Sequence, residues 1–180
     1  MNIYFYPFGF YTGLAGLLLS MVYMRRKGFG WFRMLVFGVF WLYAMLILSQ
    51  ALFPIPIVSM DAASAKQQVA EVFRRINWYP FHYGYYTFGP AVVREVVLNF
   101  LITVPAGLVL PYIFQLKRRG TWIALLVSGF GIEILQLSLG LITKVPYRVV
   151  DISDVILNSS GFILGYLVYR GFKWMIDHVQ

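Results

Sequence analysis

The chain has 180 residues, of which 60% are hydrophobic and only 12% are charged. A soluble domain carries about 25% charged residues, so this composition indicates an integral membrane protein and argues against an ordinary soluble one. The absence of cysteine excludes disulfides, thiol catalysis and thiolate metal sites. The net charge of +8 does not indicate nucleic-acid binding, because the basic residues form short clusters between apolar runs, as membrane orientation requires.

Five segments of the chain are long enough to cross the hydrocarbon core of a membrane, which takes about 20 residues in a helix. The fourth contains one charged residue, Glu133, and the fifth is the least apolar. We expect the second to end early, at the break "FPIP" (Phe53–Pro56), because proline ends helices. The predicted spans are Ile3–Met24, Met34–Val58, Val96–Leu116, Thr121–Ile142 and Ile152–Phe172.

The segment between the second and third spans has two recognisable parts. Val69, Val72, Phe73 and Ile76 follow the i, i+3, i+4, i+7 spacing of a short amphipathic helix, which we expect to lie on the membrane surface. The next stretch, "NWYPFHYGYYTFGP" (residues 77–90), is half aromatic and contains prolines and glycines. It predicts an irregular loop at the level of the lipid headgroups.

Basic residues indicate the orientation of the spans, because loops rich in Lys and Arg stay in the cytoplasm. This rule predicts a multi-pass membrane protein with its N-terminus outside and its C-terminus in the cytoplasm. The predicted fold is an all-α membrane protein, one domain over residues 1–180, with about five transmembrane helices and the interfacial amphipathic helix. The basic residues placed inside are Arg25, Arg26, Lys27, Arg33, Lys117, Arg118, Arg119, Arg170 and Lys173.

Polar residues concentrate on one face of the fourth and fifth spans. At about 100° per residue, two glycines, one acid and one amide of the fourth span fall within roughly 60° of arc. Two acids, an amide and two glycines of the fifth fall within roughly 80°. The residues are Gly129, Glu133, Gln136 and Gly140 in the fourth span and Asp151, Asp154, Asn158, Gly161 and Gly165 in the fifth. The acids and amides of these faces, with Arg148 and with Asn99 at the outer end of the third span, are expected at similar depth in the outer half of the membrane. The deeper part of the face is expected to pack helices closely.

Glu133 is expected to face the interior of the bundle, because a charge near the membrane centre costs at least about 2.5 kcal/mol. Arg148, just before the fifth span, is its expected partner. Three acids beside one arginine leave surplus negative charge, which implies a proton, a cation or a basic ligand group. Two other interpretations stay open: the polar face serves only to hold helices together, or Asp151 and Asp154 stand in water and favour the start of the fifth helix.

Four motifs occur in a characteristic order: "INWYPF" (Ile76–Phe81), "LNFLITVPAGLVLP" (Leu98–Pro111), "EILQ" (Glu133–Gln136) and "RVVDISDVILNSSGFILG" (Arg148–Gly165). Together they resemble the VanZ-like family, small bacterial membrane proteins named for a teicoplanin-resistance protein. The resemblance covers about residues 75–166. It implies a role in the cell envelope, in lowering susceptibility to a lipoglycopeptide antibiotic that acts outside the membrane, and it supplies no reaction.

The leading hypothesis is an outward-facing polar pocket that binds a polar group of an envelope lipid, a cell-wall precursor or a lipoglycopeptide. Arg148 and Asn99 would hold an anionic or carbonyl oxygen, and the acids would hold an amine or a cation. The predicted ligand-binding residues are Asn77, Asn99, Glu133, Gln136, Arg148, Asp151, Asp154 and Asn158. Gly107, Gly161 and Gly165 are predicted to pack helices closely.

Two alternatives stay open. An intramembrane enzyme would modify a lipid-linked headgroup, with Glu133 or Asp154 as general acid or base. A small transporter or proton pathway would use the acids as a relay. We expect no cofactor and no metal site, since His82 and His178 would lie on opposite sides of the membrane. The expected partners are membrane lipid and, for the leading hypothesis, a lipid-linked precursor or a lipoglycopeptide, with no nucleic acid.

Overall fold

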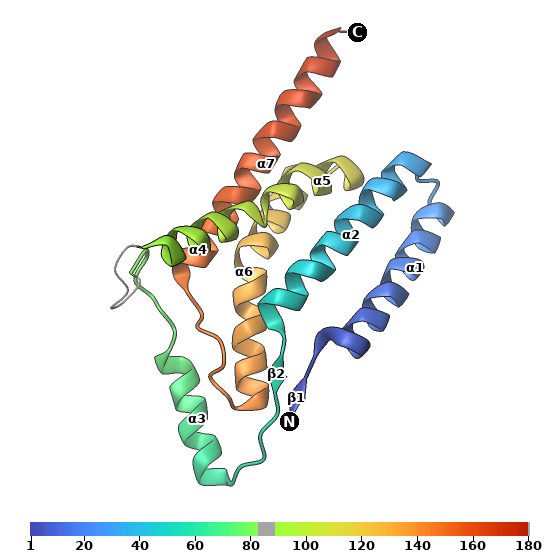
Figure 1. Cartoon of the computed structure of the whole chain (residues 1–180). Helices are drawn as coiled ribbons and strands as arrows, with labels where there is room; N and C mark the ends of the chain where they lie inside the picture. The colour runs from blue at the N-terminus through green and yellow to red at the C-terminus, as the bar shows by residue number, and fades with distance from the viewer. Residues whose placement is uncertain (83–88, 180) are drawn as a thin grey trace. The chain divides into compact units, whose positions relative to one another are not determined.

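The computed structural model describes residues 1–82 and 89–179 and is dominated by helices (Figure 1). In the described part, five stretches are helical, long and apolar enough to cross a membrane, so the chain is a multi-pass membrane protein. The prediction of an all-α membrane protein with about five transmembrane helices is confirmed. The five stretches are Phe5–Arg26, Trp31–Leu52, Pro90–Phe114, Arg118–Thr143 and Ile152–His178.

The chain forms two compact units and passes from one to the other three times: after Ile76, after Glu133 inside α6 (Arg118–Thr143), and after Val150. Unit 1 consists of Met1–Ile76 and Ile134–Val150. Unit 2 consists of Asn77–Glu133 and Asp151–Gln180. The arrangement as a single domain stays a prediction.

Unit 1 begins with a helical hairpin of α1 (Phe10–Arg26) and α2 (Trp31–Leu52), seen side by side in Figure 1. The turn between them contains Gly28 at φ +77°, a left-handed conformation that glycine adopts without strain. The indole Nε1 of Trp41 donates to the carbonyl of Gly13 at 3.0 Å and ties the two helices together. The π-helical turn η1 (Phe5–Gly9) leads into α1.

The end of α2 at Leu52 follows from the prolines behind it. Pro54 and Pro56 have no backbone N–H to donate, so a helix cannot continue through them. The second span therefore stops at the "FPIP" break, as expected, and the chain continues as β2 (Ile55–Pro56). This short strand pairs antiparallel with β1 (Asn2–Ile3).

The amphipathic helix predicted between the second and third spans is confirmed as α3 (Ala62–Arg74). Asp61 caps its start, since its carboxylate accepts a hydrogen bond from the backbone N–H of Ala63 at 3.2 Å. Val72 on its apolar face is buried, and a Cβ atom placed on Gly140 of α6 would lie 3.4 Å from it. Packing against α6, rather than helix propensity alone, therefore holds α3 in place.

The aromatic segment after α3 is described only in part. Residues 83–88 lie outside the described residues, so the structure describes only the two ends of the predicted loop. Trp78 and Tyr79 expose 68% and 74% of their surfaces. Such exposed aromatic side chains are typical of the membrane interface.

Unit 2 contains the third span as two helices, α4 (Pro90–Leu101) and α5 (Val104–Phe114). The predicted span over Val96–Leu116 corresponds to the stretch Pro90–Phe114, and Pro105 explains why two helices make up this stretch. Its ring lacks an N–H and clashes with the carbonyl four residues earlier, which is that of Leu101. The helix therefore breaks between Leu101 and Val104 and starts again with the proline in its first turn, where proline is tolerated.

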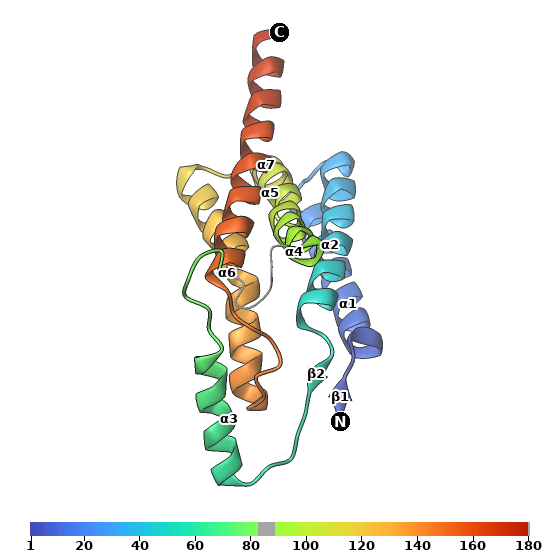
Figure 2. The same ribbon diagram turned by 60° about the vertical axis from the view of Figure 1, so that its left-hand side comes forward.

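The long helix α7 (Ile152–Val179) packs against α5 and, nearer its start, against α4 (Figures 1 and 2). Gly161, Gly165 and Gly107 lie at these crossings. A Cβ atom added to any of them would collide with a backbone carbonyl of the facing helix, which belongs to α4, α5 and α7 respectively. The absence of side chains at these positions is what lets the helix backbones touch.

The most buried side chains of unit 2 lie around these crossings. Phe162 and Ile113 are each 1% exposed, as expected for apolar residues between helices. Ser153 and Asn158 are buried to the same degree although they are polar. Burying polar groups is costly unless they form hydrogen bonds, so the hydrogen-bond partners of Ser153 and Asn158 show whether this region is only structural or can bind a ligand.

Candidate ligand-binding site

The predicted site residues fall into two groups, one in each unit. The first, here called the acid cluster, lies in unit 2; the second, here called the α2 cap, lies in unit 1. The acid cluster consists of Asn77, Asn99, Glu133, Asp151, Asp154 and Asn158, and the α2 cap of Gln136, Tyr147 and Arg148.

Asp151 is the residue that caps the start of α7. Its Oδ1 accepts a hydrogen bond from the backbone N–H of Ser153 at 2.6 Å, the usual geometry of a helix N-cap. Its Oδ2 accepts a second bond from Nδ2 of Asn77 at 2.8 Å. The carboxylate also lies at the positive end of the helix dipole, so one of the open interpretations, that Asp151 favours the start of the fifth helix, describes part of its role.

Asn77 attaches the segment after α3 to the start of α7. Its backbone carbonyl accepts from the N–H of Ile152 at 3.0 Å, and its Nδ2 also donates to the carbonyl of His82 at 2.8 Å. Nearby, the N–H of Phe81 donates to Oγ of the buried Ser153 at 2.9 Å. These contacts position Asp151 and Asn77 through both backbone and side chain.

Glu133 brings α6 to the same place. Its side chain is buried, with 4% of the residue exposed, and its Oε2 accepts from the backbone N–H of Asp151 at 3.0 Å. Asp151 and Glu133 are therefore neighbours in the structure although 18 residues separate them in the sequence. The expectation that Glu133 turns away from lipid agrees with its burial.

Asp154 and Asn158 extend the acid cluster along α7 toward α4. Nδ2 of Asn99 donates to Oδ1 of Asp154. One turn further, Oγ1 of Thr103, at the break between α4 and α5, donates to the backbone carbonyl of Asn158 at 2.5 Å. The side-chain Oδ1 of Asn158 is buried and, in the described part of the chain, has no hydrogen-bond partner. A buried acceptor left without a donor costs about 1–3 kcal/mol.

The acid cluster is unbalanced in charge. The hydrogen bonds to Glu133, Asp151 and Asp154 within unit 2 come from backbone N–H groups and carboxamides, which are neutral. Among the described residues of this unit, no ion pair involves any of the three carboxylates. The residues that the structure describes also contain no group of three or more His, Cys, Asp or Glu side chains able to hold a metal ion. A proton, a monovalent cation or a basic ligand group is what can balance this charge.

The α2 cap satisfies the end of α2. The last carbonyls of a helix have no helical N–H to accept from, and the prolines that follow supply none. Side chains from α6 and from the connection between α6 and α7 take their place. Gln136 donates to the carbonyl of Ala51 (3.0 Å), Tyr147 to that of Leu52 (3.3 Å), and Arg148 to those of Gln50 (3.1 Å) and Phe53 (3.0 Å).

The structure thus brings six of the eight predicted ligand-binding residues together in unit 2 and gives the other two a separate set of contacts. Gln136 and Arg148 bind backbone carbonyls of unit 1, and their role toward a ligand stays a prediction. The pairing of Arg148 with Glu133 joins the two units and also stays a prediction.

Sequence reasoning missed the α2 cap and three members of the network around the acid cluster. The signal for the cap was present: a helix that ends at Pro54 and Pro56 leaves carbonyls that need donors from elsewhere. The signal for Thr103 was Pro105, which breaks the span beside it. Ser153 and the N–H of Phe81 carry no comparable signal, because their partnership depends on how residues 72 positions apart fold together.

Comparison with known proteins bears on these residues directly. The family model described as VanZ/LLP1 matches residues 40–174, well over half of the chain, and includes both the acid cluster and the α2 cap. The resemblance found from the four motifs is thereby confirmed. No curated protein and no solved structure gave a match.

Proposed function

The chain belongs to the VanZ/LLP1 family, and from this premise we propose that its acid cluster binds a cationic, hydrogen-bond-donating group of a cell-envelope ligand. The ligand class is an envelope lipid, a lipid-linked cell-wall precursor or a lipoglycopeptide. Binding at the outer surface of the bacterial cytoplasmic membrane would change the access of teicoplanin to its target and so lower susceptibility to the drug.

The observation that carries this proposal is the excess of carboxylates over positive donors in unit 2. Glu133 and Asp151 share one set of hydrogen bonds and Asp154 accepts from Asn99, and every identified donor to the three carboxylates within the unit is neutral. Two unit charges about 4 Å apart near a protein surface interact with about 4 kcal/mol. An ammonium group that enters the acid cluster gains this attraction without displacing a competing side chain of the same unit.

The unpartnered amide oxygen supports a ligand that donates hydrogen bonds. Oδ1 of Asn158 is buried one helical turn beyond Asp154, so a donor that reaches Asp154 is close to the depth of Asn158. A ligand N–H or O–H would recover the 1–3 kcal/mol or so that the empty acceptor costs. Acids and an unpaired amide oxygen together favour an amine over a phosphate or a carboxylate.

The proposed orientation places the acid cluster on the outer side. The turn between α1 and α2 and the turn between α5 and α6 carry the basic runs "RRK" and "KRR", and such loops stay in the cytoplasm. The start of α7 is separated from its own basic residues, Arg170 and Lys173, by most of a membrane thickness at 1.5 Å per residue. The acid cluster then faces the compartment where lipoglycopeptides act.

The proposal is tested with two neutral variants and one matched control. Glu133→Gln and Asp154→Asn remove one charge each from the acid cluster and keep its shape, whereas Glu71→Gln removes one charge from the surface of α3, where Glu71 pairs with Arg74 and Arg75. Each variant is expressed in a teicoplanin-sensitive bacterial host, and susceptibility is measured beside the amount of protein in the membrane. We expect the two cluster variants to behave like empty vector and the control like the unmodified protein. Full protection by both cluster variants at equal expression would refute the proposal.

The same strains distinguish binding from catalysis. An enzyme that used Glu133 or Asp154 as general acid or base on a lipid-linked headgroup would leave a stoichiometric mass change in the envelope lipids. Binding alone leaves the lipid masses as they are in the vector strain. A new lipid mass that Glu133→Gln abolishes would replace the binding proposal with the enzymatic one.

A further inference from the structure

A second candidate site lies in unit 2 far from the acid cluster. Asp154 and Arg170 are 16 residues apart on α7, which is about 24 Å along the helix axis. At the Arg170 end, a groove of about 600 Å³ opens between the beginning of α6 and the middle of α7. Its apolar walls include Leu116, Trp122, Phe162 and Ile163, and its edges include Arg118 and Arg170.

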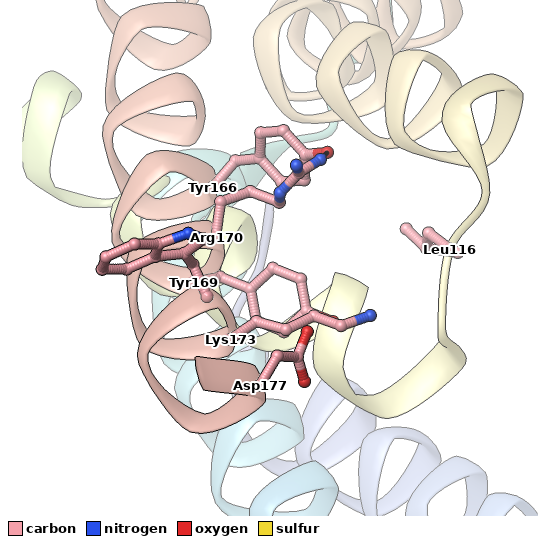
Figure 3. Close-up of a pocket in the computed structure, with 7 residues that line it drawn as sticks. Leu116, Tyr166, Tyr169, Arg170, Lys173 and Asp177 are labelled. Atoms are coloured by element: carbon pink, nitrogen blue, oxygen red, sulfur yellow. Dashed lines mark hydrogen bonds between the residues drawn. The ribbon is translucent and has the colours of Figure 1, made fainter. Parts of the chain in front are cut away.

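A smaller cavity of about 340 Å³ adjoins this groove and shares Leu116, Tyr166 and Arg170 with it. Figure 3 shows the side chains of Tyr166, Arg170 and Lys173 extending from α7 on the side that faces Leu116, with Asp177 at the lower end. The two cavities together form a continuous surface that is apolar toward the middle of α7 and charged toward its end.

The charged end is positive overall. Arg118, Arg170 and Lys173 line it against a single acid, Asp177. Arg170 donates to the hydroxyl of Tyr166 at 3.4 Å, and none of the three basic side chains forms an ion pair with a described residue. The donors of these side chains other than the one that Arg170 uses toward Tyr166 are therefore available to an anion.

We propose that this surface binds an anionic phospholipid. The phosphodiester lies between Arg118 and Arg170, where guanidinium groups can donate two hydrogen bonds to phosphate oxygens, and one acyl chain lies along Trp122, Phe162 and Ile163. Basic pockets between transmembrane helices recognise anionic headgroups in this way. A zwitterionic lipid offers the same chains but no net charge, so the arginines are what create the preference.

This inference is independent of the proposed function, because none of its residues belongs to the acid cluster. It also needs no assumption about which side of the membrane the groove faces. If the basic end of α7 is cytoplasmic, the lipid occupies the inner leaflet, where anionic lipids attract basic segments.

The test uses the purified full-length protein in neutral detergent, titrated with phosphatidylglycerol or with phosphatidylcholine of the same chain length. Binding is measured by native mass spectrometry and by thermal stabilisation. The double variant Arg118→Gln/Arg170→Gln removes two charges from the groove. The control Lys117→Gln/Arg119→Gln removes two charges from neighbouring exposed positions that line neither cavity.

We expect phosphatidylglycerol to bind in preference to phosphatidylcholine, and each arginine removed to weaken binding about fivefold, the factor expected per basic residue near anionic lipid. The control should bind as the unmodified protein does. Equal loss in both double variants would show that only net charge matters and would overturn the site. Equal binding of the two lipids to the unmodified protein would overturn it too, whether or not the variants fold.

Two further measurements keep the test decisive. Arg118→Lys/Arg170→Lys keeps the charge and should retain the preference for phosphatidylglycerol, even if the glutamine variant is unstable. Glycerol phosphate without acyl chains should bind far more weakly than the lipid, because the apolar part of the groove stays empty. If glycerol phosphate stabilises the protein as much as the lipid does, the acyl chain does not bind in the groove and the proposed lipid site is wrong.

Discussion

The α2 cap and the acid cluster are both polar groups inside a membrane protein, but they differ in which kind of group is left without a partner. Among the described residues, the cap leaves one buried donor, Nε of Arg148, and the acid cluster leaves one buried acceptor, Oδ1 of Asn158. In the α2 cap, three side chains donate to four backbone carbonyls that would otherwise have no partner. In the acid cluster, the described donors to the three carboxylates within their unit are all neutral, and no described residue donates to the buried amide oxygen of Asn158.

The difference shows how to tell a structural polar group from a functional one in lipid. Every unsatisfied backbone group in the hydrocarbon region is costly, so side-chain donors that reach the free carbonyls at a helix end stabilise the fold. A surplus of acceptors and negative charge does not stabilise the fold by itself. We therefore expect such a surplus where a proton, a cation or a basic ligand group binds.

The largest loss of stability should come from Gly161→Leu in unit 2, at the crossing of α7 with α4. A Cβ atom at this position meets the backbone carbonyl of Phe100 on α4, and a backbone cannot rotate away as a side chain can. We expect a loss of about 3 kcal/mol or more and a failure to purify as a single folded species, measured by gel filtration in detergent. Gly171→Leu on the same helix has nothing within 4 Å of its Cβ and should purify normally. Normal behaviour of Gly161→Leu would mean that α4 and α7 do not touch there.

The next effect should be loss of stability in unit 1 from Arg148→Met. The substitution keeps an apolar side chain but leaves the carbonyls of Gln50 and Phe53 without their donor. We expect a cost of about 2–3 kcal/mol, measured as a lower thermal midpoint in detergent. Arg74→Gln, which removes an exposed pair with Glu71, should cost less than about 1 kcal/mol. Equal midpoints for the two variants would contradict the role of Arg148 in the α2 cap.

A pair of amide substitutions compares the two regions directly. Gln136→Met removes the donor of the Ala51 carbonyl, whereas Asn158→Leu removes an amide oxygen that has no partner in the described structure. Without a ligand, we expect the first to destabilise the protein by about 1 kcal/mol more than the second. Thermal unfolding of both purified variants measures the difference. A reversed order would show that Asn158 already has a partner in the unliganded protein.

The smallest effect should appear at alkaline pH and depend on Tyr147. Burial raises the pKa of its phenol above the ordinary value of 10.0, although the neighbouring Arg148 acts in the opposite direction. Because the folded pKa is raised, the neutral phenol contributes stability that is fully present below pH 10 and is lost as the pH rises through the folded pKa. Tyr147→Phe should therefore lose stability less steeply than the unmodified protein above pH 10, measured by thermal unfolding across pH. Identical slopes would show that the hydroxyl is not buried against Leu52.

Much of the fold could be predicted from the sequence, because hydropathy and helical spacing act locally. The start of α7 at Ile152 and the end of α2 before Pro54 follow from charge, proline and apolar length alone. The amphipathic helix α3 follows from the spacing of its apolar residues. The division of the third span into α4 and α5 does not follow from hydropathy, because its apolar run continues unbroken through Pro105, which changes the backbone and not the hydropathy.

The candidate site could be predicted only as a set of residues, and their division into two groups could not. Glu133 and Gln136 share one face of α6, and nothing in that spacing shows that one binds the N–H of Asp151 while the other binds a carbonyl of α2. Which donors meet which acceptors depends on contacts between residues far apart in the chain. Helical periodicity gives the face of a residue, and long-range packing gives its partner.

The single turn of α6 between Glu133 and Gln136 has a consequence for how sequences of this kind can change. The two residues are three positions apart, or about 4.5 Å along the axis, and each is held by a bond to a different part of the chain. Inserting or deleting one residue between them would swing one side chain by about 100° away from its partner. Substitutions at the exposed residues Ile134 and Leu135 can be tolerated. Insertions and deletions between Glu133 and Gln136 cannot, because they would break one of the two hydrogen bonds.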